Sequence, residues 1–339
     1  NIQNSSAFGG FFGGAVSVSA GATLELEIGL LTVFNPLSLS GEGNTPGYGA
    51  LRDVSGSNMW AGPITIDAPA TSINSAGGGL ILNSIDLKGN QLNLLGAAPD
   101  AMIAGVISST VAGGSLVKED SGAWILSGYN TFSGGVSLHE GTLNINNPYA
   151  LGDVAGTFTI GGAGHSVTID NTSGAAIMLQ DYPQVWKNDF VFTGSSNLNL
   201  GNGNIALSDD ILITTSGGIL TAGGNINSTF DLSKGGPGIF KFDNQDIKLH
   251  SLSILDGTFK SPSAPGSLSL AGNFINNGTF ISNNGNVIFN GNTLQTIGGS
   301  QETQFNNLEV DNAAGTVFGN HEIIEGNLTL TSGNVGVGT

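Results

Sequence analysis

Two adjacent aspartates, Asp209 and Asp210 in the stretch ALSDDILI, are the best candidates in this chain for acid–base chemistry. A glycosidase needs two carboxyl groups that face each other across the sugar bond. Adjacent residues of a strand point to opposite faces, so these two carboxylates do not form such a pair by themselves. The pattern therefore predicts exposed carboxylates at a corner between strands.

Other arrangements known from polysaccharide-cleaving enzymes are also incomplete. A polygalacturonase pattern places Gly-His-Gly after its aspartates, whereas GAGHSV, with His165, precedes them and lacks the second glycine. Lyases on parallel β-helices use Arg or Lys as the base, and the chain offers a single arginine, Arg52. We expect no catalytic residues, and a polysaccharide-degrading enzyme remains the alternative.

Metal and cofactor sites are not indicated either. The chain has no cysteine, and neither His-x-x-x-His nor His-Glu-x-x-His spacing relates its four histidines, His139, His165, His250 and His321. The glycine-rich stretch Phe8–Ala15 is not followed by the Gly-Lys-Ser/Thr of a phosphate loop. We therefore expect no cofactor and no dedicated metal site, with incidental Ca²⁺ at clustered carboxylates as an open alternative.

The three tryptophans raise the question of sugar stacking. Trp60 and Phe132 occupy the same place in SGSNMWAGPITI and SGYNTFSGGVSL, and VWKNDFVF adds Trp186. A slot that recurs with an aromatic residue is typical of an interior stack. We expect these residues, and Trp124, to be core rather than ligand platforms.

The elements that hold these residues are short strands. Small units such as GTLNI, GTFTI, GSLSL and GNLTL recur, each a glycine followed by alternation with period two. Alternation points one side of a strand inward and the other outward, and Gly and Asn-Gly supply turns. Helical periodicity is nearly absent.

A single copy of such a unit cannot bury its apolar face, whereas stacked copies can. A right-handed parallel β-helix, an all-β solenoid with coils of roughly 20–25 residues, competes with an array of β-sandwiches of ~100 residues each. Composition is even along the chain, without the breaks that sandwiches require, and plentiful Asn suits side-chain ladders between coils. The solenoid is favoured, with about 15 coils.

One longer unit also repeats. Lys118 in LVKEDSGAWIL and Lys234 in LSKGGPGIFKF are each followed four residues later by glycine. A second glycine, Gly141 or Gly257, follows each lysine after 23 residues and opens a Gly-Thr strand. Such agreement predicts one structural unit used twice.

Composition limits the partners. Among 339 residues there are 55 glycines, and the net charge is −17 from 8 basic and 25 acidic residues. A nucleic-acid binder needs clustered cations, so that class is excluded, and an anionic membrane surface is disfavoured. The longest apolar clusters, such as IGLLTVF, are too short to span a bilayer.

Three segments resemble the autotransporter-associated β-strand repeat of bacterial passenger regions and related giant surface proteins. They are Leu116–Gly152, Gly49–Ile66 and Ile169–Gly203. The resemblance covers roughly residues 45–260. Residues 1–44 are expected to be the first coils, and residues 261–339 are similar to Asn-rich strand repeats that continue the solenoid. The resemblance implies an extracellular or cell-surface location and supplies no catalytic residues.

We therefore expect a structural segment, a stalk, adhesin or fibre, of a longer chain. Neither end shows a polar cap or an amphipathic helix, which predicts axial continuation into more polypeptide or into another copy. A glycan or a surface receptor is the expected external partner. The alternative, a carbohydrate-binding solenoid, requires a lateral groove that gathers Asp, Arg or Lys and exposed aromatic side chains over several coils.

Overall fold

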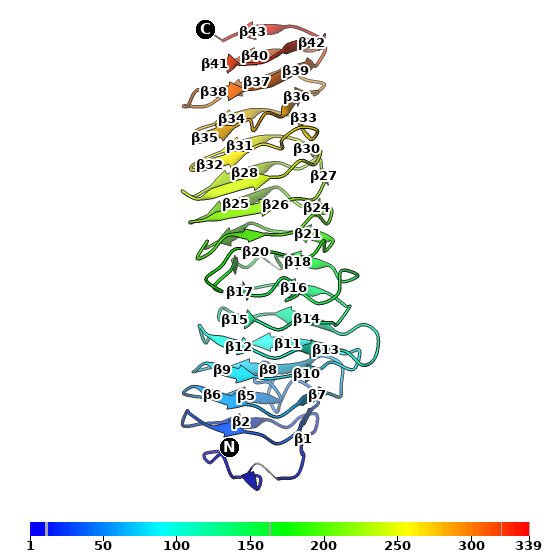
Figure 1. The fold of residues 1–339 in the computed structure, drawn as a ribbon, viewed down its shortest axis with the longest axis vertical. Helices are drawn as coiled ribbons and strands as arrows, with labels where there is room; N and C mark the ends of the chain where they lie inside the picture. The colour runs from blue at the N-terminus through cyan, green and yellow to red at the C-terminus, as the bar shows by residue number, and fades with distance from the viewer. Residues whose placement is uncertain (11–12, 163, 320, 339) are drawn as a thin grey trace. The chain divides into compact units, whose positions relative to one another are not determined.

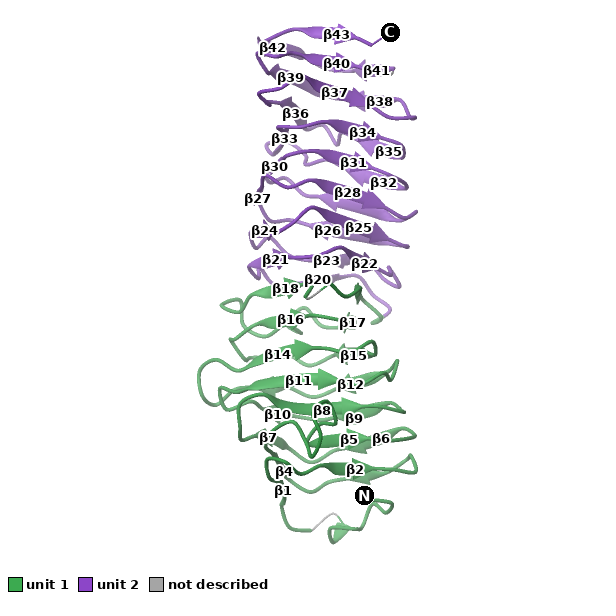
Figure 2. Ribbon diagram, turned by 180° about the vertical axis from the view of Figure 1, so that it is seen from behind, with its two compact units in different colours: residues 1–173 green, residues 174–339 purple. Residues whose placement is uncertain are grey.

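The structure, a computed structural model, describes residues 1–10, 13–162, 164–319 and 321–338. It has two compact units, unit 1 (Asn1–Ser173) and unit 2 (Gly174–Thr339), coloured separately in Figure 2. The described ranges consist of strands joined by turns, bends and irregular segments and contain no α-helix, so the all-β prediction is confirmed. Within each unit the chain winds through successive coils of short strands (Figure 1).

Unit 1 consists of three parallel sheets. Sheet 1a contains β1 (Val16–Val18), β4 (Leu37–Leu39), β7 (Ile64–Ile66), β10 (Ile85–Asp86) and β13 (Ile107–Ser108). Sheet 1b contains β2 (Leu24–Leu26), β5 (Leu51–Asp53), β8 (Thr71–Ser75), β11 (Gln91–Leu95), β14 (Ser115–Lys118), β16 (Val136–Leu138) and β18 (Phe158–Ile160). Sheet 1c contains β3 (Thr32–Val33), β6 (Asn58–Trp60), β9 (Leu80–Leu82), β12 (Ala101–Ile103), β15 (Ala123–Leu126), β17 (Gly141–Ile145) and β19 (Val167–Asp170).

Unit 2 is also built from parallel sheets. Sheet 2a contains β20 (Ile177–Met178), β23 (Leu198–Asn199), β26 (Ile219–Ala222), β29 (Ile239–Phe242), β32 (Thr258–Lys260) and β35 (Thr279–Ile281). Sheet 2b contains β21 (Gln184–Trp186), β24 (Ile205–Leu207), β27 (Ile226–Asn227), β30 (Ile247–Leu249), β33 (Ser267–Leu270), β36 (Asn286–Phe289), β39 (Asn307–Asp311) and β42 (Leu328–Ser332). Sheet 2c contains β22 (Phe190–Phe192), β25 (Ile211–Thr215), β28 (Leu232–Gly235), β31 (Leu252–Ile254), β34 (Phe274–Asn276), β37 (Gln295–Gly298), β40 (Thr316–Phe318) and β43 (Val335–Val337), and a small sheet pairs β38 (Thr303–Phe305) with β41 (Glu322–Ile324).

All described strand pairs within the units are parallel, and each strand pairs with strands one coil away. Partners along sheets 1b and 2b lie between 19 residues (Leu268 and Val287) and 27 residues (Leu24 and Leu51) apart. The predicted coil length and the parallel β-solenoid are confirmed, and the sandwich alternative is excluded because its strands would be antiparallel. Sheet 1b runs through seven coils and sheet 2b through eight. Together these make the 15 coils that the sequence predicts.

The core of unit 2 includes an aromatic ladder on sheet 2a. Phe240, Phe259 and Phe280 are in-register partners on β29, β32 and β35, and their ring centroids lie 6.0 and 6.2 Å apart. Phe305 continues the ladder at 5.5 Å from Phe280. Each ring thus fills the space above the ring of the preceding coil, which is close packing of identical side chains.

Glycine is required where one corner lies directly on another. A Cβ on Gly224 would overlap the carbonyl oxygen of Gly203, and a Cβ on Gly203 would overlap that of Tyr182, each one coil earlier. No side chain fits between backbones at this distance. The high glycine content therefore follows from stacking corners as well as from turn conformation.

The aromatic ladder supplies a stability test. Phe259 is fully buried between two rings, so Phe259→Ala leaves a cavity and is expected to lower the free energy of unfolding by about 3–5 kcal/mol. The matched control is Leu294→Ala, at a side chain 59% exposed, with an expected change within about 0.5 kcal/mol. Urea unfolding followed by Trp fluorescence measures both. Equal effects of the two substitutions would contradict the ladder as a packing element.

Candidate functional site

The aspartates Asp209 and Asp210 are exposed and lie at the corner between β24 and β25. The backbone N–H of Asp231, one coil later, donates to Asp210 Oδ1 at 2.8 Å, and that of Ser251 donates to Asp231 Oδ1 at 2.9 Å. Ser251 Oγ and Asn273 Oδ1 accept the corresponding bonds in later coils. Asp210 is therefore one step of a polar ladder that satisfies corner amides, as the expectation of a corner carboxylate requires.

Each of the four histidines lies beside a carboxylate from the preceding coil. The pairs are His139–Glu119 at 3.5 Å, His165–Glu140 at 3.6 Å, His250–Asp231 at 2.7 Å and His321–Glu302 at 2.7 Å. All four pairs are at least partly exposed, and His139 and Glu140, which belong to different pairs, are neighbours in the chain. Over the described ranges no three His, Asp or Glu side chains gather as a metal site would need. The alternative of incidental Ca²⁺ stays a prediction.

The tryptophans are interior. Trp60, Trp124 and Trp186 are at most 1% exposed, and the indole N–H of Trp60 donates to the carbonyl oxygen of Asn35 at 2.9 Å. Their expected equivalence is wrong, however. Trp60 lies in sheet 1c, Trp186 in sheet 2b and Phe132 in a loop before β16. The motif repeats in sequence, but its copies stand at different places around the coil.

Lys118 is a buried cation in an otherwise aliphatic column. Its in-register partners on the neighbouring coils are Leu94 and Leu138, and the residue is fully buried. The ammonium donates to three backbone carbonyls, those of Glu119 at 2.6 Å, Asp120 at 2.6 Å and Glu140 at 3.0 Å. One lysine thus satisfies the corner of its own coil and the corner of the next.

Lys234 reproduces this arrangement in unit 2. It lies between Ile213 and Ile254 and donates to the carbonyls of Gly235 at 2.9 Å, Gly236 at 2.6 Å and Asp256 at 3.0 Å. The last acceptor belongs, as in unit 1, to the residue 22 positions after the lysine.

The second glycine of the motif explains the spacing found in the sequence. Gly141 and Gly257 have positive φ angles of 73° and 66°, and a Cβ on either would lie 2.8 Å from the lysine Nζ. The predicted structural unit is therefore a lysine-capped corner. Its two copies use different corners, from sheet 1b to 1c at Lys118 and from sheet 2c to 2a at Lys234.

Burial sets the protonation of both lysines. Desolvation lowers the pKa of Lys118 to about 8 against the opposing attraction of Asp120 and Glu140. Desolvation likewise lowers the pKa of Lys234 to about 8, with Asp256 opposing it. Both pKa values lie above neutral pH, so most Lys118 and Lys234 side chains remain protonated there. The three carbonyls stabilise the charged form.

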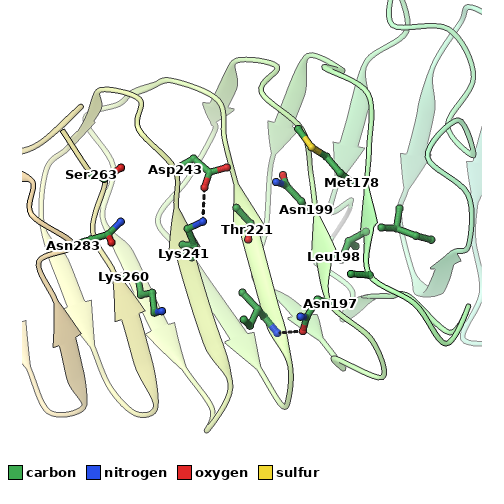
Figure 3. A pocket seen from close by; sticks show the side chains of 13 residues that line it. Met178, Asn197, Leu198, Asn199, Thr221, Lys241, Asp243, Lys260, Ser263 and Asn283 are labelled. Carbon is green, nitrogen blue, oxygen red and sulfur yellow. Dashed lines mark hydrogen bonds and ion pairs between the residues drawn. The ribbon is translucent and has the colours of Figure 1, made fainter. Parts of the chain in front are cut away.

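Sheet 2a carries a hollow of about 670 Å³ on its outer face (Figure 3). Its floor is a row of in-register outward residues on successive coils, Met178, Asn199, Thr221, Lys241 and Lys260. These alternate with the buried Leu198, Leu220, Phe240 and Phe259, so the strand pleat that builds the aromatic core also aligns the row.

The hollow has polar and apolar residues at its edges. Asp243 and Ser263 lie along one side and Asn197 along the other (Figure 3). Asn283 also lines the hollow, together with the apolar Ala176, Ile177, Leu198 and Ile219. Lys241 Nζ lies 2.6 Å from Asp243 Oδ1. No sequence motif pointed to this hollow. Its only signal was the recurrence of Lys after Phe on adjacent coils, in Phe240-Lys241 and Phe259-Lys260.

Parts of this sequence are similar to a passenger-repeat family and to a known autotransporter adhesin. The family model described as passenger-associated-transport-repeat matches residues 116–145, the segment that contains Lys118 and Gly141. The chain is 27% identical over 199 residues to the Adhesin BmaC autotransporter of Brucella suis biovar 1 (strain 1330), an alignment that covers 50% of this chain and 6% of that adhesin. The chain thus spans a small part of that relative. No solved structure matches the chain significantly. These matches confirm the resemblance to autotransporter passenger repeats.

The lysine-capped corner predicts a specific loss of stability. Lys118→Met and Lys234→Met each remove three hydrogen bonds from corner carbonyls and are expected to cost about 1–3 kcal/mol of unfolding free energy. The control is Lys248→Met, since Lys248 is exposed on sheet 2b, with a change within about 0.5 kcal/mol. Urea unfolding at neutral pH compares the three, and a corner variant as stable as the control would refute the role.

The same corner predicts a pH dependence. Because the folded-state pKa of Lys234 lies below the ordinary 10.5, the unfolded chain binds more protons between about pH 8 and pH 10.5. Stability is therefore expected to rise with pH across that window, and the rise should be smaller in Lys234→Met. A slope unchanged by that substitution would show that Lys234 is not the titrating group.

Proposed function

We propose that this chain is a segment of the surface-exposed passenger of a bacterial autotransporter adhesin, where it acts as a non-catalytic scaffold or stalk. The observation that carries the proposal is the uniform parallel stacking within each unit. Backbone, glycines, buried lysines and corner aspartates all serve that stacking. Stability in such a solenoid is a sum of coil and interface contributions, so it is maintained as coils are added.

The composition suits a surface protein. Hydrogen bonds and the apolar core of each unit stabilise the coils without cysteine, and the corners present polar residues to solvent. The net charge of −17 favours solubility and opposes side-by-side packing of copies at low salt. In the ranges that the structure describes, no helix has both the length and the apolar character needed to cross a membrane.

The non-catalytic part of the proposal is supported by how the acidic and histidine side chains are used. Asp210 and Asp231 accept corner N–H groups, and each histidine faces a carboxylate at an exposed corner. The predicted association of copies into a fibre stays a prediction. It is checked by sedimentation of the purified chain over a range of concentrations and salt.

The location is tested on cells that produce the parent protein. Antibodies raised against this chain should label intact, unpermeabilised bacteria, because a passenger segment lies outside the outer membrane. Brief protease treatment of intact cells should remove that labelling. Labelling that appears only after permeabilisation would contradict the proposal, and a cytoplasmic protein detected in the same samples controls for lysis.

The absence of turnover is tested with the purified chain. Incubation with neutral and acidic polysaccharides is expected to release neither reducing ends nor unsaturated sugars, and Asp209→Asn with Asp210→Asn should change nothing. Product release that disappears in this double variant would favour the polysaccharide-degrading alternative.

A further inference from the structure

We propose that the hollow on sheet 2a binds an acidic oligosaccharide, whose carboxylate or sulfate groups lie against Lys241 and Lys260. This inference goes beyond the scaffold role, because it assigns a ligand class to one face of unit 2. The volume of about 670 Å³ is within the range of small-ligand sites.

The first argument is the placement of positive charge. The chain has only 8 basic residues against 25 acidic ones, and Lys118 and Lys234 are buried at corners. Among the other six basic residues, Lys241 and Lys260 are in-register neighbours in the hollow. Like charges directly opposite each other on paired strands are destabilising. A bound anion would remove that repulsion.

The second argument concerns the ion pairing and burial of the two ammonium groups. Lys241 is paired with Asp243 at 2.6 Å, whereas the structure assigns no ion pair to Lys260 among the described residues. Both lysines are partly buried. Partial burial strengthens the attraction of a cation for an incoming anion relative to a fully solvated position.

The third argument is the chemistry of the lining. Asn199 Oδ1 accepts from the Gly201 N–H and Asn283 Nδ2 donates to the Ser261 carbonyl. A ligand is therefore offered the amide NH₂ of Asn199, the amide oxygen of Asn283 and the hydroxyl groups of Thr221 and Ser263. Met178, 51% exposed, adds an apolar surface for the C–H faces of a sugar ring. Neutral polar groups together with a few cations fit a ligand rich in hydroxyl groups that carries occasional negative charge.

The surroundings favour a short saccharide over a long polyanion. A net charge of −17 repels an extended nucleic acid, which would need many cations along its path. An oligosaccharide that follows the row from Asn199 to Lys260 meets one polar side chain at each coil. The coil spacing of about 4.8 Å thus provides a regular series of contacts along the axis.

The test is calorimetric titration of the full chain with oligogalacturonate, with a sulfated chondroitin oligosaccharide and with a neutral chito-oligosaccharide. Binding of either acidic probe, weakened by added salt, supports the proposal, and the two arms identify the anionic group. Lys260→Ala is expected to weaken that binding about tenfold through loss of a charge-assisted hydrogen bond. The matched control Lys248→Ala removes the same charge from sheet 2b and should change affinity little.

A gain in affinity separates the proposal from loss of folding. Asp243→Asn releases Lys241 from its ion pair and removes a negative rim charge, so acidic oligosaccharides should bind more tightly. Failure of both acidic probes to bind, equal binding of the neutral probe, or equal losses in Lys260→Ala and Lys248→Ala would overturn the inference. Equal binding of oligoglutamate would also overturn it, in favour of an acidic protein partner. None of these outcomes affects the cell-surface test.

Discussion

The constraint on which the structure depends is in-register parallel stacking. Within each unit the backbone returns, about every 21 residues, to a position one strand spacing further along, as at Ile205, Ile226 and Ile247. Hydrogen bonds within the sheets satisfy the backbone groups of the strands. The backbone amides and carbonyls at the corners lie outside these sheet hydrogen bonds. Each corner therefore needs its own solution, and most of the unusual composition follows from those solutions.

Three devices serve the corners. Side chains such as Asp210 and Asn273 accept N–H groups of the following coil. Glycines such as Gly224 leave room for the carbonyl beneath them. Lys118 and Lys234 place an ammonium among three carbonyls inside the coil. A buried charge is costly unless it is well hydrogen-bonded, and here the three acceptors meet that requirement.

Much of this was predictable because stacking is a local rule. Period-two alternation predicted the inward and outward faces, and the shared spacing from Lys118 to Gly141 and from Lys234 to Gly257 predicted one structural unit used twice. The sheet to which a given residue belongs was harder to predict. Sequence spacing counts residues along the chain, whereas loop length decides which sheet a residue joins, so Trp60 and Trp186 share a motif but not a position. The hollow was missed for the same reason, since Lys241 and Lys260 meet only once the register of sheet 2a is known. The expected division at residues 45 and 260 stays a prediction.

Cysteine crosslinking tests the register itself most directly, because the chain has no native cysteine. Ser233 and Ser253 are in-register partners on β28 and β31, and Ile275 follows on β34. In the stacked coils the first two Cα atoms lie about 4.8 Å apart, within disulfide range, and the outer two about twice as far. The account predicts rapid oxidative crosslinking of Ser233→Cys with Ser253→Cys and none of Ser233→Cys with Ile275→Cys. Equal crosslinking of both pairs, or of neither, would contradict in-register stacking.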